Sequence, residues 1–257
     1  MFNDKPYHTI NREERHFGFL FGSALIHNQE FVKEIFRKYN DLIGSSLEAL
    51  NFEIFLEVAA LRDYWFDLGN SLEYSPDTHF RRRKVLNMIL QKKGYDTELI
   101  DQEKVFWTNG KIGTGKLWCP SEWNVTELRK FEKTENDLAS VRWSFNAKPD
   151  VLIVSNNCAV FIEIKVESGG GRSYSGYDQL KIQKEISLWM KLLIPEFNNK
   201  AFFNTSLTLH NEIEIKGLTW REVIDSLRNT SEGNPGSIYT EKCLSVLYRY
   251  YTQSSII

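Results

Sequence analysis

The clearest pattern in the chain is a pair of short apolar runs on either side of an Asn-Asn dipeptide. Residues 151–154 read Val-Leu-Ile-Val, and residues 159–166 are mostly apolar and β-branched. β-Branched residues are typical of strands, and Asn156-Asn157 tolerates the positive φ angles of a tight turn. The pattern therefore predicts a β-hairpin.

A two-residue turn fixes which residues of the hairpin face each other. If Ser155 pairs with Cys158, then Asp150 lies opposite Glu163, with Cβ atoms about 4.5–5.5 Å apart. Two carboxylates at that separation repel each other unless a cation lies between them. Strand alternation puts Lys165 on the same side as Glu163, while the apolar residues of the second strand face the core. Because Mg²⁺ prefers hard oxygen ligands, the hairpin predicts a magnesium site.

Further elements are predicted after the hairpin. Apolar residues recur at helical spacing over residues 177–193, and Pro195 ends that helix. Residues 201–209 and 213–216 read as two strands. Thr219 then begins a capping-box pattern that opens a helix through about residue 227. This order of strands and helices is typical of a mixed sheet with helices packed against it.

The two ends of the chain also show helical patterns. The sequence Asn11-Arg-Glu-Glu14 opens an N-terminal helix with one apolar stripe. Glu14 projects toward the same side as that stripe, but with Asn11 it also fits an N-terminal cap. Residues 47–69 read as a helical stretch that contains Glu57. Residues 237–253 predict a last helix that packs on the core or forms a homodimer contact.

Pro149-Asp150, the hairpin and Glu163-Ile164-Lys165 together resemble the signature of the PD-(D/E)XK phosphodiesterases, the restriction-endonuclease-like superfamily. The resemblance covers residues 146–217. It implies that Asp150 and Glu163 bind Mg²⁺, for which Mn²⁺ can substitute, and that Lys165 positions or activates the attacking water. A second Glu-Ile-Lys, at residues 214–216, has no aspartate before it that would face its glutamate, so only one segment carries both halves of the signature.

The resemblance also implies the fold and two further site residues. The fold is α/β, with a mixed central sheet flanked by helices and a mainly helical insertion. In several branches of the superfamily a glutamine on the helix after the lysine strand reaches the active site, and Gln179 matches that position; the alternative is a polar helix surface. The core usually begins with a helix that carries another acid, which makes Glu14 a third metal-ligand candidate. Glu57 is its rival.

The expected organisation and activity follow from this resemblance. Residues 1–39 would form the N-terminal helix of the core, residues 40–136 an insertion with a role in target recognition, and residues 137–257 the nuclease core with the metal site. The expected activity is Mg²⁺-dependent hydrolysis of DNA by an endonuclease, in a setting such as restriction or phage defence. An RNA or single-strand nuclease, a junction resolvase, and a non-cleaving member that binds nucleic acid or protein are the alternatives.

Charged and aromatic residues indicate where nucleic acid would bind. The net charge of −2 is weak evidence against a general nucleic-acid binder, so local charge matters more. A predicted helix carries four consecutive basic residues, Arg81, Arg82, Arg83 and Lys84. They would neutralise backbone phosphates; the alternative is a solvated charged face. Arg172, in a Gly-rich loop, is a further phosphate candidate. Four tryptophans between residues 105 and 143 stack on bases or, as we favour, fill a second core.

Composition limits the remaining possibilities. With 257 residues and 42% hydrophobic residues, the chain can bury a sizeable core. No apolar run approaches the roughly 20 residues that span a bilayer, and the N-terminus shows no apolar signal segment, so we expect a cytoplasmic protein without a membrane partner. Its three cysteines lack the spacing of a zinc site.

Overall fold

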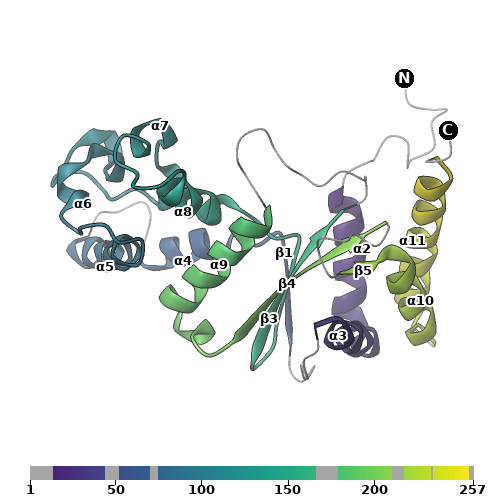
Figure 1. The fold of residues 1–257 in the computed structure, drawn as a ribbon. Helices are drawn as coiled ribbons and strands as arrows, with labels where there is room; N and C mark the ends of the chain where they lie inside the picture. The colour runs from purple at the N-terminus through teal and green to yellow at the C-terminus, as the bar shows by residue number, and fades with distance from the viewer. Residues whose placement is uncertain are drawn as a thin grey trace. The chain divides into compact units, whose positions relative to one another are not determined.

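The computed structural model describes six stretches of the chain: residues 14–43, 52–69, 75–165, 179–209, 217–232 and 234–254. The chain divides into two compact units, drawn in Figure 1. The first consists of Met1–Val58, Pro149–Gly170 and Lys200–Ile257, and the second of Ala59–Lys148 and Gly171–Asn199.

A five-stranded mixed sheet forms the centre of the first unit. Its strands are β1 (Glu53–Leu56), β2 (Val151–Val154), β3 (Cys158–Ile164), β4 (Ala201–Thr208) and β5 (Leu218–Thr219). They lie in the order β1-β2-β3-β4-β5, and the first three are antiparallel neighbours. β4 runs parallel to both β3 and β5. The predicted α/β class with a mixed sheet is therefore confirmed.

The predicted hairpin register is confirmed at every pair. Val151 pairs with Ile162 and Val154 pairs with Ala159, which is the alignment that follows when Ser155 faces Cys158. The Ser155 N–H donates to the Cys158 carbonyl at 2.8 Å, which closes the turn as the sequence predicts. A short turn with tolerant residues thus sets the alignment of both strands.

Four helices of the first unit pack with one face of this sheet (Figure 1). They are α2 (Glu14–His27), α3 (Gln29–Ile43), α10 (Trp220–Thr230) and α11 (Pro235–Ser254). The predicted apolar stripe of α2 is buried, and Phe17 and Phe21 pack against Trp220, with ring centroids 5.1 and 6.2 Å away. β2 and β3 contribute alternate residues such as Ile153 and Ile162 to the same core.

The second unit is mainly helical. Its helices are α4 (Ala60–Asp67), α5 (Pro76–Lys92), α6 (Leu99–Gln102), α7 (Val125–Leu128), α8 (Asp137–Asn146) and α9 (Gln179–Leu193), with 3₁₀-helices η1 (Lys104–Phe106), η2 (Thr108–Gly110), η3 (Pro120–Glu122) and η4 (Pro195–Phe197). Trp107 and Trp123 are buried, which confirms that they fill a second core; Trp118 and Trp143 are half-buried.

Several predicted elements agree with the structure and one does not. The helix before Pro195 and the capped helix from Thr219 are present as α9 and α10, and Thr219 forms a complete capping box with Glu222. The predicted helical stretch 47–69 is confirmed over Ala60–Asp67, which is α4, but it is wrong over Glu53–Leu56, which is a strand whose burial alternates along the chain. The predicted strand 213–216 lies outside the described residues.

The unit boundaries also differ from the segments drawn on the sequence. β1 comes from residues 40–136 yet pairs with β2 in the sheet. Conversely, α8 and α9 come from residues 137–257 yet lie in the helical unit. None of the described helices has both the length and the apolar character that crossing a bilayer would need.

Candidate active site

Asp150 completes the hydrogen bonding of the hairpin at the point where the backbone ladder is interrupted. Hydrogen-bonded and non-hydrogen-bonded pairs alternate along an antiparallel ladder, and Ser155–Cys158 is a hydrogen-bonded pair. Counting along the ladder from the turn, residues 149 and 164 would form the hydrogen-bonded pair at the open end. Pro149 has no N–H, so it cannot donate to the Ile164 carbonyl and the regular ladder ends here. The Ile164 N–H donates to Oδ2 of Asp150 at 2.7 Å, which fixes that carboxylate at the end of the sheet.

The register places three acids in one row across neighbouring strands. Leu56 pairs with Val151, so the next residue, Glu57, lies opposite Asp150. Val151 pairs with Ile162, so Asp150 in turn lies opposite Glu163. Asp150 and Glu163 occupy a non-hydrogen-bonded position of the ladder, where facing Cα atoms are about 4.5 Å apart.

The backbone of Glu57 has an uncommon conformation. Its φ angle is 47°, in the left-handed region that disfavours residues with a Cβ atom. Its N–H donates to the Asp150 carbonyl at 3.2 Å, so this conformation is tied to the strand that carries Asp150. Residues held in unfavourable backbone conformations cluster at functional sites, which makes Glu57 a candidate functional residue.

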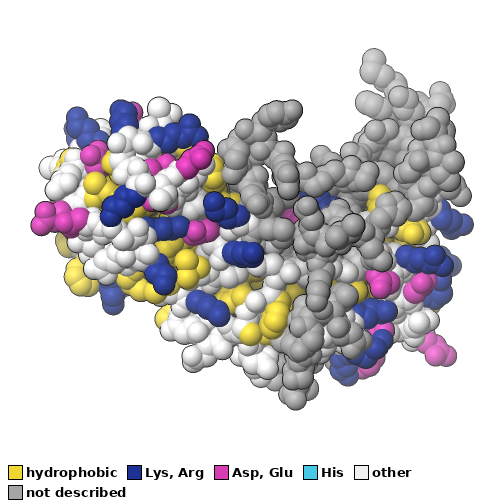
Figure 2. Space-filling model, in the orientation of Figure 1, with side chains coloured by type: hydrophobic (Ala, Val, Ile, Leu, Met, Phe, Trp, Pro, Cys, Tyr) yellow, Lys and Arg dark blue, Asp and Glu magenta, His cyan; other side chains and the backbone are white. Residues whose placement is uncertain are grey.

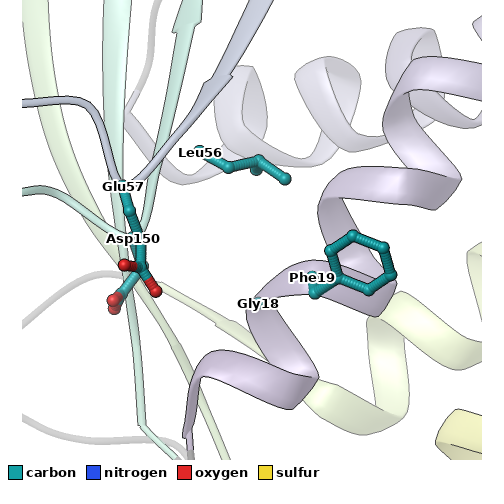
Figure 3. A pocket seen from close by; sticks show the side chains of 5 residues that line it. All are labelled: Gly18, Phe19, Leu56, Glu57 and Asp150. Atoms are coloured by element: carbon teal, nitrogen blue, oxygen red, sulfur yellow. The ribbon is translucent and has the colours of Figure 1, made fainter.

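Glu57 and Asp150 line a single pocket with Leu56 of β1 and Gly18 and Phe19 of α2. Figure 3 shows the two carboxylates on one side of this pocket and the Phe19 ring on the other. The pocket measures about 220 Å³, which is room for several water molecules at about 30 Å³ each. A hydrated metal ion or a phosphate group is therefore of the right size to enter.

Lys165 and Glu163 form an ion pair with little access to solvent. Lys165 Nζ donates to Glu163 Oε1 at 2.9 Å, and the two side chains are 18% and 11% exposed. The backbone of Lys165 is fixed on both sides, because its N–H donates to Leu207 O at 2.8 Å and its carbonyl accepts from Trp220 Nε1 at 3.2 Å. The lysine predicted to act beside the metal is thus held against one of the two predicted ligands.

The oxygen donors at this end of the sheet fit a magnesium ion. Mg²⁺ is usually held by one or two carboxylates and retains several waters, so it does not require a closed cage of protein ligands. Within the described ranges, no group of three or more His, Cys, Asp or Glu side chains forms a ready-made metal site. Asp150 and Glu163 can supply the direct ligands. Glu57, which follows β1 and lies opposite Asp150, can contact the ion through a water.

Three other predicted site residues are not placed by the structure. Glu14 is the first residue of α2 and Gln179 the first of α9, but both side chains lie outside what is described. Arg172 lies entirely outside the described residues. Gln183, one turn after Gln179 on α9, is buried.

The basic run on α5 is less available to phosphate than its sequence indicates. Arg82 is 6% exposed, and its guanidinium lies over the Trp65 ring at 5.3 Å, so burial lowers its pKa and Arg82 is not a surface cation. Arg83 makes two hydrogen bonds to Asp101, which lower the pKa of that carboxyl. Arg81 pairs with Asp77 on the same helix.

Lys84 is exposed. On the face seen in Figure 2, Lys and Arg side chains are interspersed with Asp and Glu over the described residues. A mixed surface of this kind corresponds to the solvated charged face that the sequence left open as the alternative to phosphate binding. The structure therefore gives the basic run less weight than the acidic row.

Sequence reasoning gave Glu57 only as a rival to Glu14 and did not single out Phe19. The alternation of Glu53-Ile54-Phe55-Leu56 is the signal that would have identified β1 and thereby placed Glu57 at a strand end. Phe19 lies off the buried stripe of α2, so an aromatic residue on the polar side of a predicted helix was its signal.

A scan against models of protein families, a search of curated proteins and a search of solved structures each find no match to this chain. A functional assignment therefore depends on the geometry of the site.

Proposed function

We propose that this protein is a Mg²⁺-dependent nuclease of the PD-(D/E)XK type, with Asp150, Glu163 and Lys165 as its signature residues. The observation that carries the proposal is the alignment of Asp150 with Glu163 across β2 and β3, with Lys165 bonded to Glu163 at 2.9 Å. The mixed sheet with helices packed on it supports a restriction-endonuclease-like core.

Each residue has a role that follows from its position. Asp150 and Glu163 would hold the ion, and Asp150 is pre-oriented because the Ile164 N–H holds one of its oxygens. We take Glu57 in preference to Glu14 as the third acid, acting through a metal-bound water, because Glu57 lines the pocket with Asp150. When bound, Mg²⁺ polarises the phosphodiester and lowers the pKa of a bound water.

Lys165 would act on the attacking water and on developing charge. A positive ammonium beside that water favours its deprotonation and stabilises negative charge in the transition state. The backbone of Lys165 is held by Leu207 and Trp220, so the ammonium is delivered from a rigid strand end. Little reorganisation is then needed during the reaction.

DNA is the proposed substrate, with RNA or single strands as the alternative that shares the same chemistry. A non-cleaving binding protein of the same fold is the alternative from another class. The enzyme is favoured by two facing acids, by a lysine paired with one of them, and by a third acid, Glu57, that shares a pocket with Asp150, because carboxylates gathered without a ligand repel each other.

The test compares the wild type with Asp150→Asn and Lys165→Met on supercoiled plasmid, single-stranded DNA and RNA, with and without Mg²⁺. Asn keeps an oxygen that can accept from the Ile164 N–H but removes the charge, so folding is preserved and cleavage is lost. Asp225→Ala is the control, since Asp225 is an exposed acid paired with Arg228 on α10. Full Mg²⁺-dependent activity in Asp150→Asn would overturn the proposal.

A further inference from the structure

An exposed aromatic ring stands at the edge of the acidic pocket. Phe19 is 63% exposed, although the other apolar residues of α2 between Phe17 and Leu25 are buried. Single exposed apolar residues are common on protein surfaces and need no explanation by themselves. Phe19 differs from such residues because it lines the same pocket as Glu57 and Asp150 (Figure 3).

The pocket divides into two chemically different sides. Glu57 and Asp150 provide carboxylates on one side, and the Phe19 ring provides an apolar π face on the other. Gly18 precedes Phe19 on α2 and also lines the pocket. A Cβ atom there would come to 3.2 Å from Ile164 Cδ1, so α2 packs closely against the end of β3 at this point.

A nucleotide has the complementary division. Its phosphate would approach an ion held by the carboxylates, and its base is a flat ring that stacks on aromatic side chains. At about 220 Å³ the pocket accommodates the ion with the phosphate, so the base would lie outside it, against the exposed Phe19 ring.

We propose that Phe19 stacks on the base next to the scissile phosphate, and that the substrate is therefore a strand with unpaired bases at the cut; this inference rests on the nuclease function proposed above. Within a duplex both faces of a base are covered by its neighbours, so stacking on a side chain requires a single strand, a frayed end or an extruded base. Phe19 thus acts as a specificity residue and not as a metal ligand.

The experiment measures KM and kcat for Mg²⁺-dependent cleavage of a single-stranded oligonucleotide and of a relaxed closed-circular plasmid. Phe19→Ala is expected to raise KM for the single strand by about 5- to 150-fold, the range for removing one stacked aromatic, with kcat little changed. Phe19→Trp is expected to restore KM. Tyr239→Ala is the control, because Tyr239 on α11 is an aromatic residue of similar exposure, 69%, that is not among the residues lining the pocket.

The outcomes separate this inference from the proposed function. An unchanged KM in Phe19→Ala, or preferential cleavage of the closed duplex by the wild type, overturns the stacking role and leaves the nuclease intact. If the wild type cleaves nothing, the nuclease proposal fails, and binding of fluorescein-labelled oligothymidine in the presence of Mg²⁺ decides the stacking role. Absence of binding, or equal affinity of the wild type and Phe19→Ala, then overturns it.

Discussion

Replacing Glu57 with glycine should separate the stability of the site from its function. The left-handed backbone at Glu57, with φ of 47°, costs about 1–2 kcal/mol for a residue with a Cβ atom. Glycine removes that cost but loses about 0.4–1 kcal/mol through its greater freedom in the unfolded chain. The net expectation is a metal-free protein whose stability lies between unchanged and about 1.6 kcal/mol higher, or a Tm up to about 3–6 °C higher for a chain of this size.

Magnesium should offset this gain. An ion at 100 times its Kd stabilises the wild type by about 2.7 kcal/mol. Loss of a side chain that acts through a metal-bound water weakens metal binding about tenfold or more. The gain of Glu57→Gly at the same concentration is then about 1.4 kcal/mol or less. The Mg²⁺-induced rise in Tm should therefore be about 3–5 °C smaller in the variant than in the wild type.

Thermal melting with and without Mg²⁺ measures both effects, and two controls isolate them. Glu57→Gln keeps the backbone cost but removes the charge, so it should show the same smaller Mg²⁺-induced rise in Tm without the metal-free gain. Asn136→Gly relieves another positive φ angle, of 62°, in the helical unit and should leave the magnesium effect unchanged. A Mg²⁺ shift in Glu57→Gly equal to that of the wild type would refute the role assigned to this residue.

Three further predictions concern the scaffold of the two units. Thr219→Ala removes the capping box of α10 and should cost about 1 kcal/mol in urea unfolding, whereas Thr219→Ser should cost little. Lys93 forms an ion pair with Glu185 at 2.5 Å, in which both side chains are about 15% exposed, so Lys93→Ala leaves that carboxylate without its cation. We expect the free energy of unfolding to fall by about 2–3 kcal/mol, which is less than for a fully buried pair, and to recover in part in the double variant with Glu185→Gln. Gly22→Ala brings a Cβ atom to 2.3 Å from Leu56 Cδ2, an overpacking cost of about 1–3 kcal/mol that the better helix propensity of alanine reduces by about 1 kcal/mol; calorimetry should show stability lower by up to about 2 kcal/mol together with weaker Mg²⁺ binding.

The features that the sequence predicted correctly are those set by short-range physics. The hairpin register follows from a two-residue turn and strand alternation, and these alone place Asp150 opposite Glu163, in agreement with the pairing of β2 and β3. The capped start of α10 and the buried stripe of α2 are likewise properties of a few neighbouring residues.

The features that it missed depend on partners far away in the chain. β1 is only four residues long, and its pairing with β2 rather than its own propensity makes it a strand. Glu57 therefore enters the site through a register that no local pattern reveals. The basic run predicts a surface cation at Arg82, because the sequence does not show that its guanidinium lies over Trp65. In each case a tertiary contact overrides the local signal.

Calorimetric titration of the wild type, Asp150→Asn and Glu163→Gln with Mg²⁺ and Mn²⁺ tests the central claim most directly. The account predicts that the wild type binds an ion and that each variant binds it at least about tenfold more weakly, because each loses one of two facing carboxylates. Equal affinity in all three proteins, or no binding by the wild type, would contradict the claim that Asp150 and Glu163 together hold a metal ion.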